Sequence, residues 1–356
     1  MMKRMSALLL TLVMVLGLLT ACGGGGTGGG AASDPAPAPE AEKDAPAQDA
    51  DSGSAETEHL QIGLVLSGNA NDGGWNQMAA DAAQTVADKY GCTVNYTEAV
   101  KATDFESTIQ GYAEAGYDIV VAHGAEFLDA SKQVAKDYPE TRFINTSAFS
   151  GQEPNLTGID FGAFELGFLT GAACAYATEA KKIGVIIAVE SDSMLLWAEG
   201  IKAAAKYIDD SIETVVVATG TFDDPIKAKQ ATDALAEQGC DVITQNADAC
   251  GNGAVEECDT LGLINVGAVG DQSGFGESCF LTVVQDAHLG IETAISQAIE
   301  GTLQSGAVVM GANAGVIYLT DYTGKYADLL TDEEKASLQD FWQQAHDGVD
   351  LSTLVS

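Results

Sequence analysis

A short polar turn that contains a tryptophan has the residue types best suited to binding a flat ligand. Residues 71–77 are Asn-Asp-Gly-Gly-Trp-Asn-Gln. The indole of Trp75 offers a face for stacking, while Asn71, Asp72 and Asn76 supply hydrogen-bond donors and acceptors for the edge of a ring. In the structural alternative, Trp75 fastens a helix to a neighbouring element. We favour the binding role.

Later parts of the chain add further candidates for this site. Trp197 could stack on the ligand from the opposite side, although core packing explains it equally well. For Phe127 the core explanation is the stronger one. Polar and glycine residues after strand-like segments complete the predicted ligand-binding set: Asn71, Asp72, Trp75, Asn76, Phe127, Trp197, Asn246, Gly251 and Asp271.

Motifs for catalysis, metal binding or nucleotide binding are weak in this sequence. Gly251-Asn-Gly253 lacks the third glycine of a dinucleotide fingerprint, and GxxxxGK[ST], HExxH and GxSxG motifs do not occur. His123, at a strand end, is better explained by packing than by general-base catalysis. Asp223 and Asp224 are better explained as caps of a helix that starts near Pro225. We therefore predict a binding protein without cofactor or metal, not an enzyme.

The elements that would position these residues alternate between strand-like and helix-like segments. An apolar run ends in the tryptophan turn, and apolar residues at helical spacing follow it as far as Tyr90. Near-continuous apolar strands are typical of a parallel sheet with helices on both faces, where ligands bind at the carboxyl ends of the strands. The predicted strands cover residues 93–98, 117–123, 142–146, 182–188, 214–218, 241–245 and 264–269.

A second series of strands and helices predicts a second lobe. It starts with a helix over 164–179 and includes a Gly-rich loop over 246–253 before a helix over 254–261. We assign residues 59–148 and about 281–318 to the first lobe, and residues 149–280 and about 319–356 to the second. The chain then crosses between the lobes more than once.

The N-terminal residues predict export and attachment to a lipid. Lys3 and Arg4 precede an apolar core over 7–18, which is too short for a comfortable membrane span. The following Leu-Thr-Ala-Cys resembles the lipobox of bacterial lipoproteins, a family in which the chain is cut before the cysteine and its thiol is lipidated. We expect a signal peptide over 1–21, a lipid on Cys22 and a flexible tether over 22–58. A secretory signal without lipidation is the less favoured alternative.

Composition limits the class of partner. The 356 residues are 46% hydrophobic, enough for a sizeable core, and the formal net charge is −36. Such a charge repels phosphate backbones, so we expect no nucleic-acid partner. No two cysteines have CxxC spacing, which leaves either partial oxidation around Cys240, Cys250 and Cys258 or simple burial of thiols.

Several motifs, in order along roughly residues 60–318, resemble those of the basic membrane lipoprotein family. Characterised members of that family include purine nucleoside receptors that serve ABC importers. The family's Asp-Asp-Lys-Ser-Phe-Asn-Gln turn is similar to residues 71–77, and its Gly-Val-Asp-x-Asp-Gln motif to residues 267–272. Other positions that fit its pattern are Gly116, Asp118, Gly124, Phe127, Phe161, Glu165, Gly167, Gly171, Trp197, Gly200, Phe222, Asp224, Gly251 and Gly253.

The resemblance implies a type I periplasmic binding protein, with two Rossmann-like α/β lobes of parallel strands joined by a hinge. It also implies a monomeric, lipid-anchored receptor on the extracytoplasmic face of the cell membrane. Such a receptor closes on a purine nucleoside or a related flat heteroaromatic ligand and delivers it to an ABC permease and its ATPase. A receptor of the same fold that reports to a signalling partner is an alternative, and a nucleoside hydrolase is a less favoured one.

Two departures from the family pattern concern the ligand. Val269 replaces an aspartate that contacts the ribose in nucleoside-binding members, and residues 281–286 lack the lysine found there in the family. Unpaired sugar hydroxyls are costly in a buried site. A free purine or another flat ring is therefore an alternative to a nucleoside.

Overall fold

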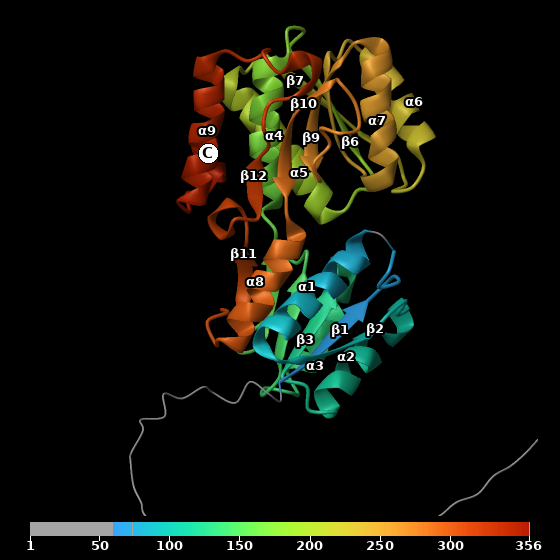
Figure 1. Cartoon of the computed structure of the whole chain (residues 1–356), viewed down its shortest axis with the longest axis vertical. Coiled ribbons are helices and arrows are strands. Elements are labelled where there is room, and N and C mark those ends of the chain that lie inside the picture. The colour runs from blue at the N-terminus through green and yellow to red at the C-terminus, as the bar shows by residue number, and fades with distance from the viewer. Residues whose placement is uncertain (1–59, 73, 356) are drawn as a thin grey trace, which may run out of the picture. The chain divides into compact units, whose positions relative to one another are not determined.

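The computed structural model describes residues 60–72 and 74–355, which form two six-stranded sheets with helices on both faces (Figure 1). The first sheet has the order β11-β5-β4-β3-β1-β2 and the second the order β12-β10-β9-β8-β6-β7. Every strand pair is parallel except β12 with β10. The prediction of two α/β lobes with parallel sheets is confirmed. The predicted signal peptide, Cys22 and the tether lie outside the described residues.

The first lobe is a sheet between two pairs of helices. Along β1, Leu64 and Leu66 pack with α1 and α8 on one face, whereas Val65 packs with α2 and α3 on the other. Its strands are β1 (Gln61–Leu66), β2 (Thr93–Thr97), β3 (Ile119–His123), β4 (Arg142–Thr146), β5 (Leu156–Asp160) and β11 (Gly306–Val309). Its helices are α1 (Trp75–Tyr90), α2 (Phe105–Glu114), α3 (Leu128–Ala135) and α8 (Ala287–Ile299).

The second lobe repeats this layering. Ile183 and Val185 of β6 belong to the cluster that contains α4, α5 and α9, whereas Ile186 packs with α6 and α7, which lie side by side (Figure 1). Its strands are β6 (Lys182–Ile187), β7 (Glu213–Ala218), β8 (Val242–Asn246), β9 (Ile264–Val269), β10 (Cys279–Gln285) and β12 (Ile317–Leu319). Its helices are α4 (Ala163–Ala177), α5 (Asp192–Ile208), α6 (Pro225–Glu237), α7 (Asp248–Leu261) and α9 (Asp332–His346).

The chain passes between the sheets at three places. They follow β5, β10 and β11, because β5 and β11 pair in the first sheet while β10 and β12 pair in the second. The first crossing therefore comes after Asp160 rather than near residue 148, and the second after Gln285 rather than near residue 280. The sequence pattern does not predict β5, because Thr157 and Gly158 interrupt its run of apolar residues.

The prediction of a Gly-rich loop over 246–253 is wrong, because α7 already begins at Asp248. The two glycines of this stretch are helical and serve close packing. A Cβ on Gly251 would lie 1.7 Å from Oε1 of Gln245, and a Cβ on Gly253 would lie 2.0 Å from the carbonyl oxygen of Pro225. Glycine at these positions lets α7 approach β8 and α6.

Helices α4 and α5 also pack with their backbones close together. A Cβ on Gly167 would lie 2.0 Å from the carbonyl oxygen of Trp197, and one on Gly200 would lie 2.3 Å from that of Phe164. Almost all of α4 is buried, which explains its apolar composition on every side. Glycines that fit the family pattern thus have a packing role in this pair of helices.

Candidate functional site

The turn between β1 and α1 is held in place by Asp72. Its Oδ1 accepts hydrogen bonds from the N–H groups of Gly74 (2.8 Å) and Gln77 (3.1 Å), and its Oδ2 accepts from the N–H and the side-chain amide of Asn76 (3.2 and 2.8 Å). A carboxylate has about four acceptor positions, so these bonds occupy them. Burial raises the pKa of Asp72, but these hydrogen bonds outweigh it and lower the pKa overall.

Asn76 completes this turn from within. Its side chain is buried, its Oδ1 accepts from the N–H of Gly68 at 3.1 Å, and a Cβ on Gly68 would lie 2.4 Å from its Nδ2. Asp72 and Asn76 therefore shape the turn. Asp72 accepts from the N–H groups of Asn76 and Gln77 in the first turn of α1, while Gly74 occupies the N-cap position. Asn71 is exposed at the same turn.

Trp75 is half-buried, and its ring has a defined position. It stacks on the imidazole of His123 with a centroid distance of 4.2 Å and an interplanar angle of 27°, and it meets Phe161 edge-on at 6.4 Å. His123 ends β3, which lies next to β1 in the sheet. The predicted stacking residue therefore lies at the carboxyl edge of the first sheet, where ligands of such folds bind.

His123 is fully buried and is neutral at pH 7. Burial lowers its pKa to about 4, although the hydrogen bond to Trp75 and the charge of Asp72 act in the opposite direction. Its Nε2 lies 3.0 Å from the carbonyl oxygen of Trp75, and its Nδ1 lies 2.9 Å from Oγ1 of Thr146. This packing role agrees with the sequence-based interpretation of His123, which did not foresee its contact with Trp75.

The other two aromatic candidates lie in hydrophobic cores. Phe127 has no exposed surface and its ring centroid is 4.1 Å from that of Phe105. Trp197 is 1% exposed, and its backbone packs against α4. Among the described residues, the ring contacts of Trp75 are to His123 and Phe161, so the structure does not bring the three predicted rings together.

The second sheet presents polar groups at its own carboxyl edge. Asn246 ends β8 and is half-buried, and Asp271 follows β9, where its Oδ1 accepts from the N–H of Ser273 at 2.9 Å. Asp248, absent from the predicted set, lies beside Asn246. Asp248 is exposed as a residue, but neighbouring atoms partly desolvate its carboxyl group and so raise its pKa. The negative charges of Asp223 and Asp72 raise this pKa further. Its place directly after a strand was the available sequence signal.

Strained backbone marks these same edges. Among the described residues, five non-glycine residues have positive φ, and four of them lie at a strand end or within two residues after one: Ala99 (53°), Ser147 (52°), Asp248 (47°) and, as the last residue of β9, Val269 (70°). Such conformations cost free energy and are found preferentially at functional sites. Val269 is β-branched, for which this region is especially unfavourable. The position of the strain supports the carboxyl edges as the functional surface.

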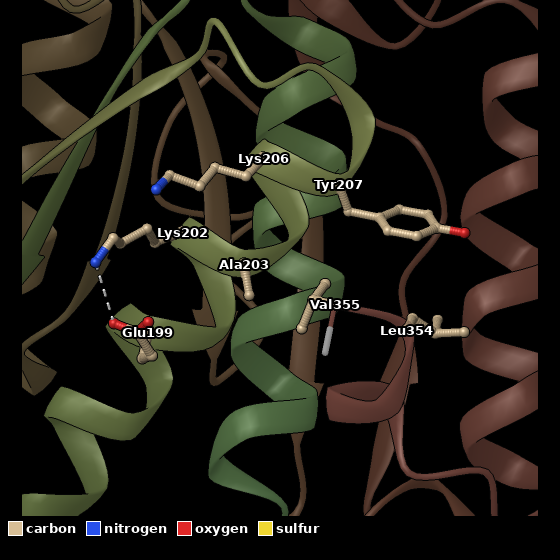
Figure 2. A pocket seen from close by; sticks show the side chains of 7 residues that line it. All are labelled: Glu199, Lys202, Ala203, Lys206, Tyr207, Leu354 and Val355. Carbon is tan, nitrogen blue, oxygen red and sulfur yellow. Dashed lines mark ion pairs between the residues drawn. The ribbon is translucent and has the colours of Figure 1, made fainter.

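Two hollows on the surface lie elsewhere. The larger, of about 550 Å³, lies between α5 and the C-terminal residues; Figure 2 shows Tyr207 beside Leu354, with Lys202 paired to Glu199 on the other side. The smaller, of about 240 Å³, is lined by Asp160, Glu165 and Asp350 among others. Neither contains a residue of the predicted ligand-binding set.

No cluster of three or more His, Cys, Asp or Glu side chains is arranged to hold a metal ion in residues 60–72 and 74–355. No helix within those ranges has the length and apolar character to cross a membrane. The six cysteines in those ranges are free thiols, and all but Cys92 are buried, in agreement with the burial alternative.

Comparison with known proteins places most of the chain in one family. Residues 59–349 match the family described as Bmp, ABC transporter substrate-binding protein PnrA-like. The transcriptional activator protein med of Bacillus subtilis is 26% identical, with 74% of this chain and 82% of that protein covered. The ABC transporter nucleoside-binding protein BmpA of Lactococcus lactis is 29% identical, with 57% of this chain and 59% of that protein covered.

Solved structures confirm the fold. An ABC transporter solute-binding protein from Aeropyrum pernix superimposes with a TM-score of 0.67 at 19% identity, with 83% of this chain and 95% of that chain covered. The two lobes of mostly parallel strands are thus those of a type I periplasmic binding protein.

Proposed function

Because the chain belongs to the PnrA-like family of ABC transporter substrate-binding proteins, we propose that it binds a purine or a related flat heteroaromatic ligand between its two lobes. In this proposal it is a receptor anchored by a lipid on Cys22 at the extracytoplasmic face of the cell membrane. It delivers its ligand to an ABC permease and ATPase. Membership of a family of binding proteins favours this role over a nucleoside hydrolase.

The position of Trp75 carries the proposal. The ring lies at the carboxyl edge of the first sheet and stacks on His123, and Trp75 as a residue is only half-buried. An aromatic face of this kind binds planar rings by stacking. Asn71 from the same turn, and Asn246 and Asp271 from the second lobe, are the candidates for hydrogen bonds to the ring's edge.

Fewer side chains are candidates for binding a sugar than for binding a base. Val269 offers no polar group at the end of β9. Gln285 donates its side-chain amide to the carbonyl of Phe161 at 3.0 Å, and Asp286 caps α8 by accepting from the N–H of Leu289 at 3.0 Å. Gln285 and Asp286 are therefore already hydrogen-bonded within the protein. This favours a ligand that is recognised through its base, including a free nucleobase.

A ligand screen tests the proposal. The whole chain in detergent is heated with adenine, guanine, adenosine, guanosine or glucose at increasing concentration, because a ligand that binds the native state raises the melting temperature. We expect stabilisation by purine bases, with or without ribose. Stabilisation by glucose alone would contradict the stacking proposal.

Substitution of the stacking ring provides the second half of this test. Trp75→Ala should weaken purine binding by about 1–3 kcal/mol, the usual value for one stacked base. Tyr207→Ala is the matched control, because Tyr207 is 49% exposed, lies near the C-terminal end of α5 and is not in the predicted ligand-binding set. An unchanged affinity for Trp75→Ala with a lower melting temperature would assign Trp75 to the core instead.

A signalling receptor is the second candidate, favoured by the similarity to a protein described as a transcriptional activator. The same fold and ligand would serve it, but closure would act on a sensor protein rather than a permease. Crosslinking in cells distinguishes the two, because it captures either permease subunits or a signalling protein. Neighbouring genes for a permease and ATPase would support transport.

A further inference from the structure

The side chain of His123 makes two contacts with Trp75, although the two residues are 48 positions apart in the sequence. Its ring stacks on the indole, and its Nε2 lies 3.0 Å from the carbonyl oxygen of the same residue. Trp75 is also the first residue of α1. One side chain on β3 therefore fixes both the ring of Trp75 and the start of its helix.

The hydrogen bonds around His123 define a single tautomer. A carbonyl oxygen only accepts, so Nε2 must carry the proton and donate it to Trp75. Nδ1 then accepts from the hydroxyl of Thr146, whose oxygen in turn accepts from the N–H of Gly124 at 3.0 Å. Each polar atom of this buried group has a partner, so the imidazole has little freedom to turn.

The contacts of Trp75 are unequal on its different sides. The imidazole covers one face of the indole, Phe161 meets it edge-on, and Trp75 as a whole remains only half-buried. The residue therefore combines a fixed orientation with accessible surface. A binding group that is already ordered loses less conformational entropy when a ligand arrives.

We propose that His123 is a positioning residue, whose neutral imidazole fixes Trp75 in the orientation that receives the ligand. The inference rests on the proposed function, because it takes Trp75 as the ligand-stacking ring. His123 itself does not touch the ligand. Loss of its two contacts lets the indole move, and ordering one such side chain on binding weakens affinity by about 2- to 10-fold.

Fluorine NMR reports the position of Trp75 without any ligand. The whole chain, which has three tryptophans, is labelled with 5-fluorotryptophan, and Trp75→Phe identifies its resonance. His123→Ala should shift or broaden the resonance of Trp75 and leave those of Trp197 and Trp342 in place. Ser131→Ala is the matched control, because it removes another buried hydrogen bond of the first lobe, the 3.0 Å bond to Asn145. An unmoved Trp75 resonance in His123→Ala would overturn the inference.

The two contacts of His123 are separated by two further variants. His123→Phe keeps a ring for stacking but cannot donate to the carbonyl of Trp75, and His123→Gln keeps a donor but has no ring. We expect each to disturb Trp75 less than His123→Ala does. Equal disturbance by all three would mean that general loss of packing, not these contacts, moves the indole.

A double-mutant cycle with adenine and adenosine as probes links positioning to binding. His123→Ala should weaken binding of whichever probe the unaltered chain binds by about 2- to 10-fold, but should have no further effect in a chain that already carries Trp75→Ala. Equal weakening in both backgrounds would show a structural role of His123 and overturn the inference alone. If Trp75→Ala leaves binding unchanged, or if neither probe binds, the proposed function fails first.

Discussion

The carboxylate of Glu165 accepts a hydrogen bond from the backbone N–H of Ala312 at 2.7 Å. Glu165 lies in the first turn of α4, directly after the crossing that follows β5, and Ala312 lies in the crossing that follows β11. A Cβ on Gly311 would lie 2.6 Å from the same carboxyl group. Two of the three connections between the lobes are thus joined by one half-buried side chain.

This carboxyl group predicts a pH dependence of stability. Burial raises the pKa of Glu165 above its usual 4.5, the hydrogen bond from Ala312 opposes this, and Asp160 and Asp350 raise it further. Between pH 4.5 and the raised pKa, the folded chain therefore binds a proton at Glu165 more readily than the unfolded chain does. Stability from this group is complete below pH 4.5 and is lost as the pH rises through the raised pKa.

Glu165→Gln should remove this loss of stability at higher pH, because an amide carries no charge and its oxygen can still accept the hydrogen bond from Ala312. We expect a higher melting temperature than that of the unaltered chain at pH 7, with a benefit of about 1.4 kcal/mol for each pKa unit of the upward shift. The difference should disappear near pH 4. Thermal unfolding between pH 4 and pH 7 measures it, and a variant that is less stable at pH 7 would show that the charge itself is needed.

The sequence predicted most elements of the fold because buried parallel strands leave a clear apolar pattern. The strand β5 left no such pattern, because Gly158 in its middle is required by packing. A Cβ there would lie 2.2 Å from the carbonyl oxygen of Ser150. Likewise, the glycines of α7 suggested a loop, since only the folded structure shows what lies against them.

The candidate site was predicted in part. Trp75 could be placed at a carboxyl edge from its position after an apolar strand. The Asp72 carboxylate accepts four hydrogen bonds within the turn. These bonds depend on the directions of three backbone N–H groups and one side-chain amide, and sequence spacing does not predict those directions. The contact of Trp75 with His123 depends on the pairing of β1 with β3, which becomes known only with the order of strands.

The close packing of α4 and α5 predicts a large effect of a small substitution. Gly167→Ala would place a methyl group 2.0 Å from the carbonyl oxygen of Trp197, so the two helices would have to separate. We expect a loss of about 1–3 kcal/mol in the free energy of unfolding. Chemical denaturation measures this loss.

Gly111→Ala is the matched control for that substitution. Gly111 lies within α2, and a Cβ there would meet no atom within 4 Å. Alanine should therefore stabilise the chain by about 0.5–1 kcal/mol through its higher helix propensity. Equal effects of the two substitutions would contradict the close approach of α4 to α5.

Lipid attachment is predicted for Cys22, which lies outside the described residues. In a bacterial host that processes lipoproteins, the unaltered chain should appear in the membrane fraction, and Cys22→Ser should move it to the soluble fraction. Mass spectrometry of the mature N-terminus should detect the lipid on Cys22. Cys92→Ser is a control that keeps the lipidation site, and an unlipidated N-terminus in the unaltered chain would contradict the prediction.

Val269 predicts how the ligand preference can be changed. Its φ of 70° is costly for a β-branched side chain, whereas aspartate and asparagine tolerate this region better. Val269→Asp should therefore fold, and it should add an acceptor for sugar hydroxyls at the end of β9. We expect adenosine to gain about 10-fold or more over adenine, since a hydrogen bond to a charged group contributes about 1.5–3 kcal/mol. Val269→Asn, measured by calorimetry alongside, should relieve the same strain with a smaller gain, and an equal response of both probes would place Val269 away from the sugar.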